Sequence, residues 1–177
     1  MQQTALFLSS ATPAPRWPTA PAAPLTTRPL LSAAERQAWI GVVSREHVQR
    51  GVAGNFVQLN HGQKAPVRRL RAGDRIAMYS PRAAYPDGAA LQCFTAIGVV
   101  VSGEVYQVEM SPDFRPWRVD VGFAPCREAP IRPLIDRLSF IRSKTQWGAA
   151  FRFGQLKVPA QDFELIASAM QVEWPED

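Results

Sequence analysis

The chain has 177 residues, of which 46% are hydrophobic and 20% are charged, and this mixture is typical of a globular domain. Its formal net charge is +5, and it has only two cysteines. Because its apolar runs are far shorter than the roughly 20 residues of a membrane span, composition excludes an integral membrane protein, and the cysteine count excludes a disulfide-rich scaffold. The first residues lack the positive region of a signal peptide, so we expect a cytoplasmic protein with no membrane partner.

Residues 1–36 differ from the rest of the chain. They contain six prolines among alanines, threonines and serines, and they show no apolar period. Such a segment buries too little apolar surface to offset the entropy lost on ordering. We therefore expect residues 1–36 to form a disordered tail and residues 37–174 to form one folded domain.

The first predicted elements follow directly after this tail. The pattern predicts, in order, a strand over residues 38–43, a helix over 45–50, an ordered loop over 51–66 and a strand over 75–80. Ser44 is suited to cap the helix and Gly51 to end it. Pro81 is expected to end the last of these strands.

The second half continues the strand pattern and closes with a helix. It predicts strands over 91–101, 105–110 and 117–123, a short helix over 133–138, a strand over 151–158 and a helix over 159–170. Gly98 is expected to mark a bulge or bend. The closing helix carries a buried stripe of Phe163, Ile166, Ala167 and Met170. These elements predict an α+β domain built on a curved sheet or small barrel.

The positive charge is concentrated in one segment. Residues 42–82 contain eight basic and two acidic residues, whereas residues 83–177 contain nine basic and twelve acidic residues. Arginine accounts for 17 of the 20 basic residues, and its planar guanidinium suits phosphates and base edges. Charge alone favours an anionic partner and a merely solvated surface about equally.

Catalytic motifs are missing from the sequence. His47 and His61 are the only histidines, and neither has metal-ligand spacing to another nitrogen or sulfur ligand. There is no nucleophile elbow, Walker loop or dinucleotide fingerprint. We expect a protein that is not an enzyme and that holds no metal or cofactor.

Aromatic residues instead occur beside polar and basic ones at predicted loops and strand ends, as in residues 55–58, 78–82 and 114–118. A pocket for an unpaired base needs flat apolar walls, a few hydrogen-bonding groups and basic residues at its rim. The sequence contains all three. Trp117 alternates in phase with Val119, Val121 and Phe123, so periodicity places it in the core rather than in a pocket.

Several stretches match a known family in collinear order. They are Trp39-Ile40-Gly41-Val42-Val43-Ser44-Arg45-Glu46-His47-Val48, Arg50-Gly51-Val52, Phe56, Gln58, His61-Gly62, Gly73-Asp74, Tyr79-Ser80-Pro81-Arg82, Phe114-Arg115-Pro116-Trp117-Arg118, Leu138-Ser139-Phe140-Ile141 and Trp147-Gly148. Together they resemble an EVE domain over residues 38–170. The tail lies outside this resemblance.

The resemblance implies a PUA-like fold, a bent β-barrel flanked by short helices, related to YTH and ASCH domains and found in bacterial proteins. Such domains receive a nucleobase in a pocket, and EVE domains are associated with modified bases. The implied base pocket comprises Ser44, His47, Asn55, Phe56, Gln58, Tyr79, Ser80 and Trp117. Asn55 stands where a glycine is expected, and asparagine tolerates the left-handed conformation.

The leading hypothesis is a non-catalytic nucleic-acid-binding reader of a modified base. The first candidate is modified cytosine in DNA, and methylated adenine or RNA are the further candidates. Its expected phosphate contacts are Arg45, Arg68, Arg69, Arg82 and Arg118. The expected partner is nucleic acid with modified bases, and a nuclease is a second candidate. Two alternatives remain open: a site that binds or processes free nucleosides or nucleotides, and a module whose basic loop binds an acidic protein. Sequence leaves the modification and the oligomeric state undetermined.

Overall fold

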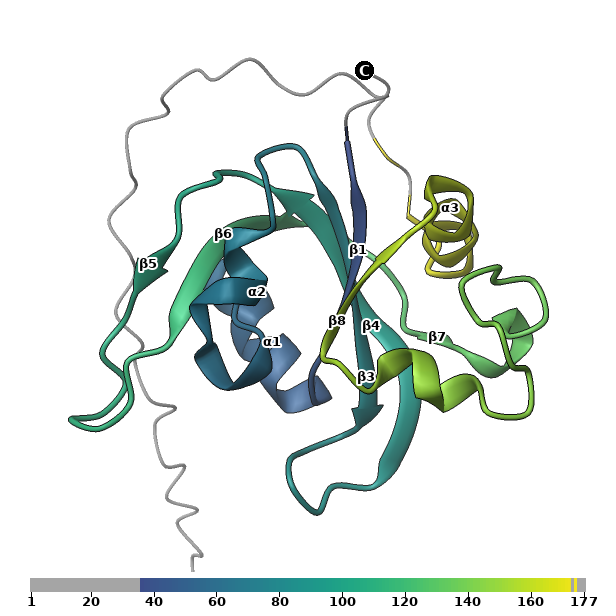
Figure 1. The fold of residues 1–177 in the computed structure, drawn as a ribbon, viewed down its shortest axis with the longest axis horizontal. Helices are drawn as coiled ribbons and strands as arrows, with labels where there is room; N and C mark the ends of the chain where they lie inside the picture. Colours follow the sequence, from purple (N-terminus) through teal and green to yellow (C-terminus); the bar gives the residue numbers. More distant parts are fainter. Residues whose placement is uncertain (1–35, 173, 175–177) are drawn as a thin grey trace, which may run out of the picture.

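A computed structural model describes residues 36–172 and residue 174. The predicted tail therefore lies outside the described residues, apart from Arg36. The described chain confirms the predicted α+β class, because a strongly curved sheet carries a few short helices (Figure 1). No helix in this part of the chain is long and apolar enough to cross a membrane.

The sheet has eight strands in the described residues, and six of them follow the order β2-β6-β4-β3-β1-β8. The strands are β1 (Ala38–Val42), β2 (Phe56–Val57), β3 (Arg75–Arg82), β4 (Ala90–Val100), β5 (Tyr106–Gln107), β6 (Trp117–Phe123), β7 (Ala129–Pro130) and β8 (Gln155–Val158). β1 pairs with β3 in parallel, and the other pairings are antiparallel. β5 pairs with β6, and β7 pairs with β4.

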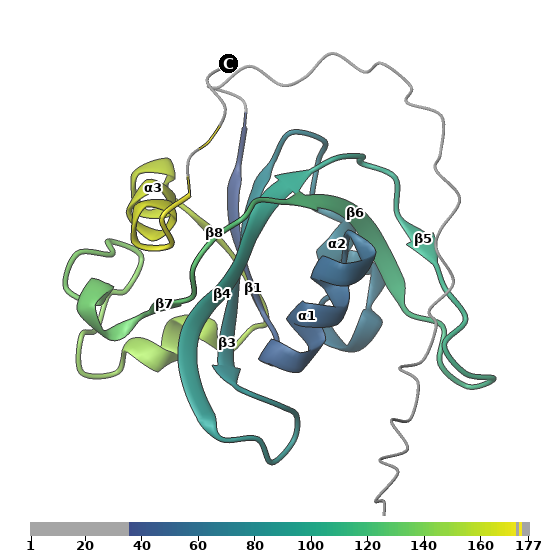
Figure 2. The ribbon, with the colours of Figure 1, turned by 180° about the vertical axis from the view of Figure 1, so that it is seen from behind.

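Both faces of the centre of the sheet are buried, because alternate residues along each strand point into two separate hydrophobic cores. Figures 1 and 2 show α1 (Arg45–Gly54) and α2 (Lys64–Arg68) inside the curl of the sheet and α3 (Ala160–Ala169) on the other side. Trp39 and Met78 join the core beside α1 and α2, whereas their neighbours Ile40 and Tyr79 join the core beside α3.

Helix α1 is longer than predicted. Gly51 does not end it, and the helix continues to Gly54 before Asn55 adopts the left-handed conformation, with φ 53° and ψ 42°. A Cβ at Gly51 would lie 2.6 Å from the Phe56 carbonyl oxygen, so this glycine permits close packing rather than termination. Ser44 occupies the N-cap position, but its side chain forms no capping hydrogen bond.

The segment predicted as a loop, residues 51–66, is largely regular. It contains the end of α1, β2, a 3₁₀ turn over Asn60–Gly62 and the start of α2. Pro81 also does not end its strand, and β3 continues to Arg82. The β3–β4 register shifts between Ser80 and Arg82, and such an irregularity accommodates a proline that cannot donate to the ladder.

In the second half, β6 has the predicted bounds, and the buried stripe of α3 is confirmed. The segment predicted as a helix over 133–138 begins with a 3₁₀ turn at Arg132–Leu134. The strand predicted over 151–158 begins only at Gln155, because a 3₁₀ helix over Trp147–Phe151 and a turn over 152–154 precede it. Gly98 marks no bulge. A Cβ there would lie 2.5 Å from the Gly122 carbonyl oxygen, so this glycine permits close approach of β6.

Candidate functional site

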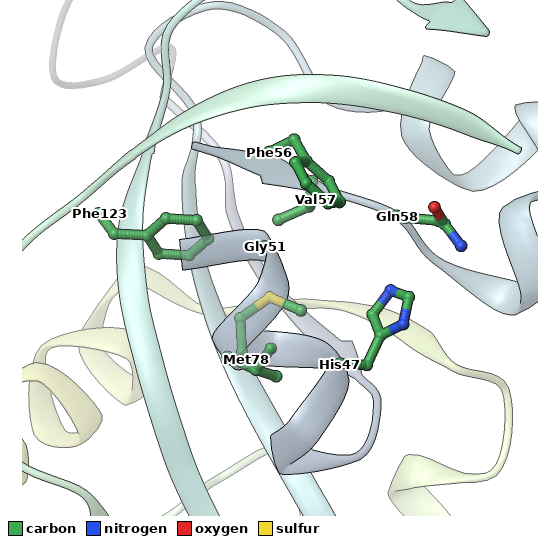
Figure 3. A pocket seen from close by; sticks show the side chains of 8 residues that line it. His47, Gly51, Phe56, Val57, Gln58, Met78 and Phe123 are labelled. Atoms are coloured by element: carbon green, nitrogen blue, oxygen red, sulfur yellow. The ribbon is translucent and has the colours of Figure 1, made fainter. Parts of the chain in front are cut away.

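A small cavity of about 10 Å³ lies where α1, β2 and the inner face of the sheet meet. This volume is close to the minimum that one water molecule needs. Its lining comprises His47, Val48, Gly51, Phe56, Val57, Gln58, Met78 and Phe123 (Figure 3). Three residues of the predicted base pocket, His47, Phe56 and Gln58, therefore meet at this cavity.

Helix α1 supplies His47, whose ring lies below Phe56 and Gln58 in Figure 3. Its Nε2 atom is buried and has no hydrogen-bond partner among the described residues. Burial lowers the pKa of His47 from its ordinary value of 6.5, and the positive charge of Arg118 lowers this pKa further. A hydrogen bond with the Gln58 backbone acts in the opposite direction. At neutral pH the cavity thus holds an uncharged imidazole.

Strand β2 and the residue after it supply Phe56 and Gln58. The Phe56 ring is half-buried, and the Cζ atom of Arg118 lies 3.7 Å from the ring centroid. The Gln58 side chain is buried, and its Oε1 atom accepts a hydrogen bond of 3.1 Å from Arg118 Nε. Arg118, predicted to contact phosphate at the rim, therefore lies against the predicted stacking ring.

A shallow basic depression, open to solvent, lies on the surface of α2. Its volume is about 410 Å³, and it is lined by Lys64, Ala65, Arg68 and Arg69. The Nζ atom of Lys64 lies 4.0 Å from the centroid of the Trp117 ring. Two of the predicted phosphate contacts, Arg68 and Arg69, thus share one exposed concave surface, which we call the α2 depression.

Tyr79 and Ser80 do not line the cavity. Tyr79 faces the core beside α3, where its ring stacks on Phe151 with a centroid separation of 4.1 Å. Burial raises the pKa of Tyr79 to about 12. Ser80 is fully buried, and its hydroxyl lies 2.8 Å from that of Thr95.

The resemblance implied Tyr79 as a residue of the base pocket, but its neighbour Met78 lines the cavity. Sequence reasoning missed Met78 and Phe123 as cavity residues. The available signal was the two-residue alternation of each strand, which places Phe123 on the same face as Val121 and Met78 on the opposite face from Tyr79.

The other predicted residues lie outside the cavity lining. Ser44 is half-buried at the start of α1, and Asn55 is exposed, with its backbone oxygen accepting a hydrogen bond of 2.9 Å from Val121 N. Arg45 forms an ion pair with Glu128. Arg82 donates to the Gly88 backbone oxygen over 3.1 Å. Trp117 is half-buried and packs against the core beside α1 and α2, as its periodicity predicted.

Comparisons with known proteins connect this arrangement to a family. The EVE domain profile matches residues 37–169. A UPF0310 protein of Mycolicibacterium vanbaalenii is 55% identical over 132 residues, which cover 75% of this chain and 91% of that protein. The UPF0310 protein YdcG of Bacillus subtilis is 46% identical over 134 residues, which cover 76% and 92% of the two chains. The solved structure of Rpa0253 from Rhodopseudomonas palustris is 15% identical in sequence. The match covers 76% of this chain and 93% of that chain, with a TM-score of 0.47.

Proposed function

The chain belongs to the EVE domain family, and from this premise we propose that it is a non-catalytic reader that binds nucleic acid and accepts a modified base against Phe56. The family fold is PUA-like, a bent barrel with few short helices. The family relation supports a binding domain, and the proposal for its ligand rests on the residues at the cavity.

The main supporting observation is the meeting of Phe56, Gln58 and His47 at one cavity. An aromatic ring offers a stacking surface to any base, and buried amide and imidazole groups offer hydrogen bonds to a base edge. Such groups discriminate strongly, because a ligand that leaves a buried polar group unpaired loses affinity. Ring and polar groups together therefore suit recognition of one kind of base.

The α2 depression supports a nucleic acid as the carrier of that base. Lys64, Arg68 and Arg69 form no ion pair among the described residues, and all three are exposed. Unpaired cations on a concave surface attract a phosphate backbone. This site adjoins β6, the strand that also carries Arg118, so backbone contacts and base contacts are compatible with one ligand.

Binding of fluorescent oligonucleotides tests the proposal. Single-stranded and duplex DNA and RNA would each carry one 5-methylcytosine, 5-hydroxymethylcytosine or N6-methyladenine, with the unmodified strand as reference. One modified strand is expected to bind more tightly than its reference. Phe56→Ala should weaken that binding about 10- to 100-fold, because a base stacked on an aromatic side chain contributes about 1–3 kcal/mol.

Phe153→Ala is the matched control, since Phe153 is 81% exposed and does not line the cavity. Equal affinity for all strands, with no effect of Phe56→Ala, would contradict the proposal.

A further inference from the structure

Arg118 holds an unusual position for a cation at a nucleic-acid site. Its guanidinium covers one face of the Phe56 ring, its Nε atom donates to Gln58 Oε1 over 3.1 Å, and its Nη2 atom lies 3.1 Å from the sulfur of Met110. A guanidinium is planar and stacks on aromatic faces much as a base does. Arg118 therefore covers a surface that the proposed reader needs for its ligand.

The charge of Arg118 is not neutralised by these contacts. Its three partners are a ring, an amide oxygen and a thioether, and no carboxylate in the described residues forms an ion pair with it. The carboxylate of Asp120, two residues along the same strand, instead accepts a hydrogen bond of 2.7 Å from Tyr106. Burial lowers the pKa of Arg118, which shows that desolvation disfavours its charged form at this place.

Such an arginine has more to gain from an anion than from its present partners. Arg pairs with phosphate through two parallel hydrogen bonds between opposite charges, whereas Arg118 now donates one bond to the neutral amide oxygen of Gln58. The cavity of about 10 Å³ is also too small for a base beside the guanidinium. A base that stacks on this face of Phe56 must displace Arg118, and a phosphate attached to that base is a suitable new partner.

We propose that Arg118 is a displaceable cover of Phe56 that turns to the phosphate next to the incoming base, so that the site selects a base carrying a phosphate over a free nucleoside. The inference rests on the proposed function, because it concerns the same ring. It defines the ligand class as a nucleotide, either free or within a strand. A free nucleoside displaces Arg118 without offering it a new anionic partner and is therefore selected against.

The test compares three forms of each base: the nucleoside, its 5′-monophosphate and a short single strand with the base at its centre. The bases are 5-methylcytosine and N6-methyladenine, and calorimetry or NMR titration measures the affinity. Wild-type protein should prefer the monophosphate over the nucleoside about tenfold, the size expected when a phosphate gains a charge-assisted contact. Tighter binding of the strand than of the monophosphate would indicate a nucleic acid as the ligand, and the reverse order would indicate a free nucleotide.

Two substitutions separate the cover from the phosphate contact. Arg118→Ala should bind the nucleoside about tenfold more tightly than wild type, because no cation–π contact or hydrogen bond must be broken, and it should lose the preference for phosphate. Arg118→Lys lacks the planar group but keeps the charge, so it should bind the nucleoside more tightly and keep the preference. Arg142 is exposed and lines neither the cavity nor the α2 depression, so Arg142→Ala removes a positive charge and should leave nucleoside affinity unchanged.

Unchanged or weaker nucleoside binding by Arg118→Ala would overturn the inference, and the proposed function would stand if wild-type binding still depends on Phe56. Absence of binding by wild type and variants alike would overturn both. The free protein gives an independent readout: the Arg118 Nε–H proton should be shifted upfield by the Phe56 ring, and Phe56→Leu should remove this shift. Equal proton positions in the two proteins would overturn the cover itself.

Discussion

His47 shows how one residue links the site to the stability of the fold. Its pKa is lowered first by burial and then by Arg118, and His61 adds a smaller effect in the same direction. The unfolded chain therefore takes up a proton near pH 6.5 that the folded protein resists. The stability that His47 contributes is complete above this pH and is lost as the pH falls through the lower pKa of the folded state.

We predict that the free energy of unfolding falls as the pH is lowered from 7 to 5, and that His47→Gln reduces this fall. Urea unfolding at several pH values measures the effect.

We also expect Arg118→Ala to raise the pKa of His47, since it removes a neighbouring positive charge. NMR titration of the imidazole checks this second result, and an unchanged or lower pKa would show that burial alone determines it.

At the scale of elements, α1 positions the ring of Phe56 through a glycine. A Cβ at Gly54 would lie 2.6 Å from Phe56 Cε1, although Gly54 itself is exposed. The following residue, Asn55, adopts the left-handed conformation, as was expected for an asparagine at this position. The end of α1 and the start of β2 therefore form one unit that holds the Phe56 ring.

We predict that Gly54→Ala weakens binding of the modified strand several-fold without destabilising the protein. Alanine favours a helix over glycine by about 1 kcal/mol, which offsets the cost of moving the ring. Binding and urea unfolding would be measured in parallel. Gly148→Ala is the matched control, because a Cβ at Gly148 would meet no heavy atom within 4 Å. Equal binding by both variants would contradict the prediction, because it would mean that the position of the Phe56 ring does not affect binding.

The same elements show what can be predicted from sequence. Strand β6 and helix α3 were predicted well, because the two-residue period of a strand and the 3.6-residue period of a helix decide which face is buried. The end of α1 and the end of β3 were predicted wrongly, because Gly51 and Pro81 act through close packing and a register shift. Such effects depend on residues distant in sequence, which no local pattern contains.

Across the whole molecule, the sheet separates two cores, and this separation decides which predicted site residues meet. Phe56, Gln58 and His47 meet because α1 packs beside β2 on the inner side of the sheet, whereas Tyr79 points to the opposite core. The family resemblance named segments for the base pocket, but it did not indicate the direction of each side chain. The cover formed by Arg118 was also unpredictable, since it joins residues 56 and 118 through the β2–β6 pairing.

Six of the eight basic residues in the positive segment fall into two groups in the folded structure. Arg45, Arg50 and Arg75 form ion pairs with Glu128, Glu46 and Glu164. Lys64, Arg68 and Arg69 form none in the described part of the chain, and they line the α2 depression. Three basic residues of this segment that form no ion pair therefore lie together on one short helix and its end.

We predict that the double substitution of Arg68 and Arg69 by alanine weakens modified and unmodified strands by the same factor. Each phosphate contact contributes about 0.7 to the slope of log affinity against log salt for single strands, so this slope should fall by about 1.4. Anisotropy titrations at several salt concentrations measure it. Phe56→Ala should leave the slope unchanged and remove only the preference for the modified strand. The factor is the same for both strands because contacts to a phosphate backbone act on every sequence alike. An unchanged slope in the double variant would show that the phosphates bind elsewhere on the protein.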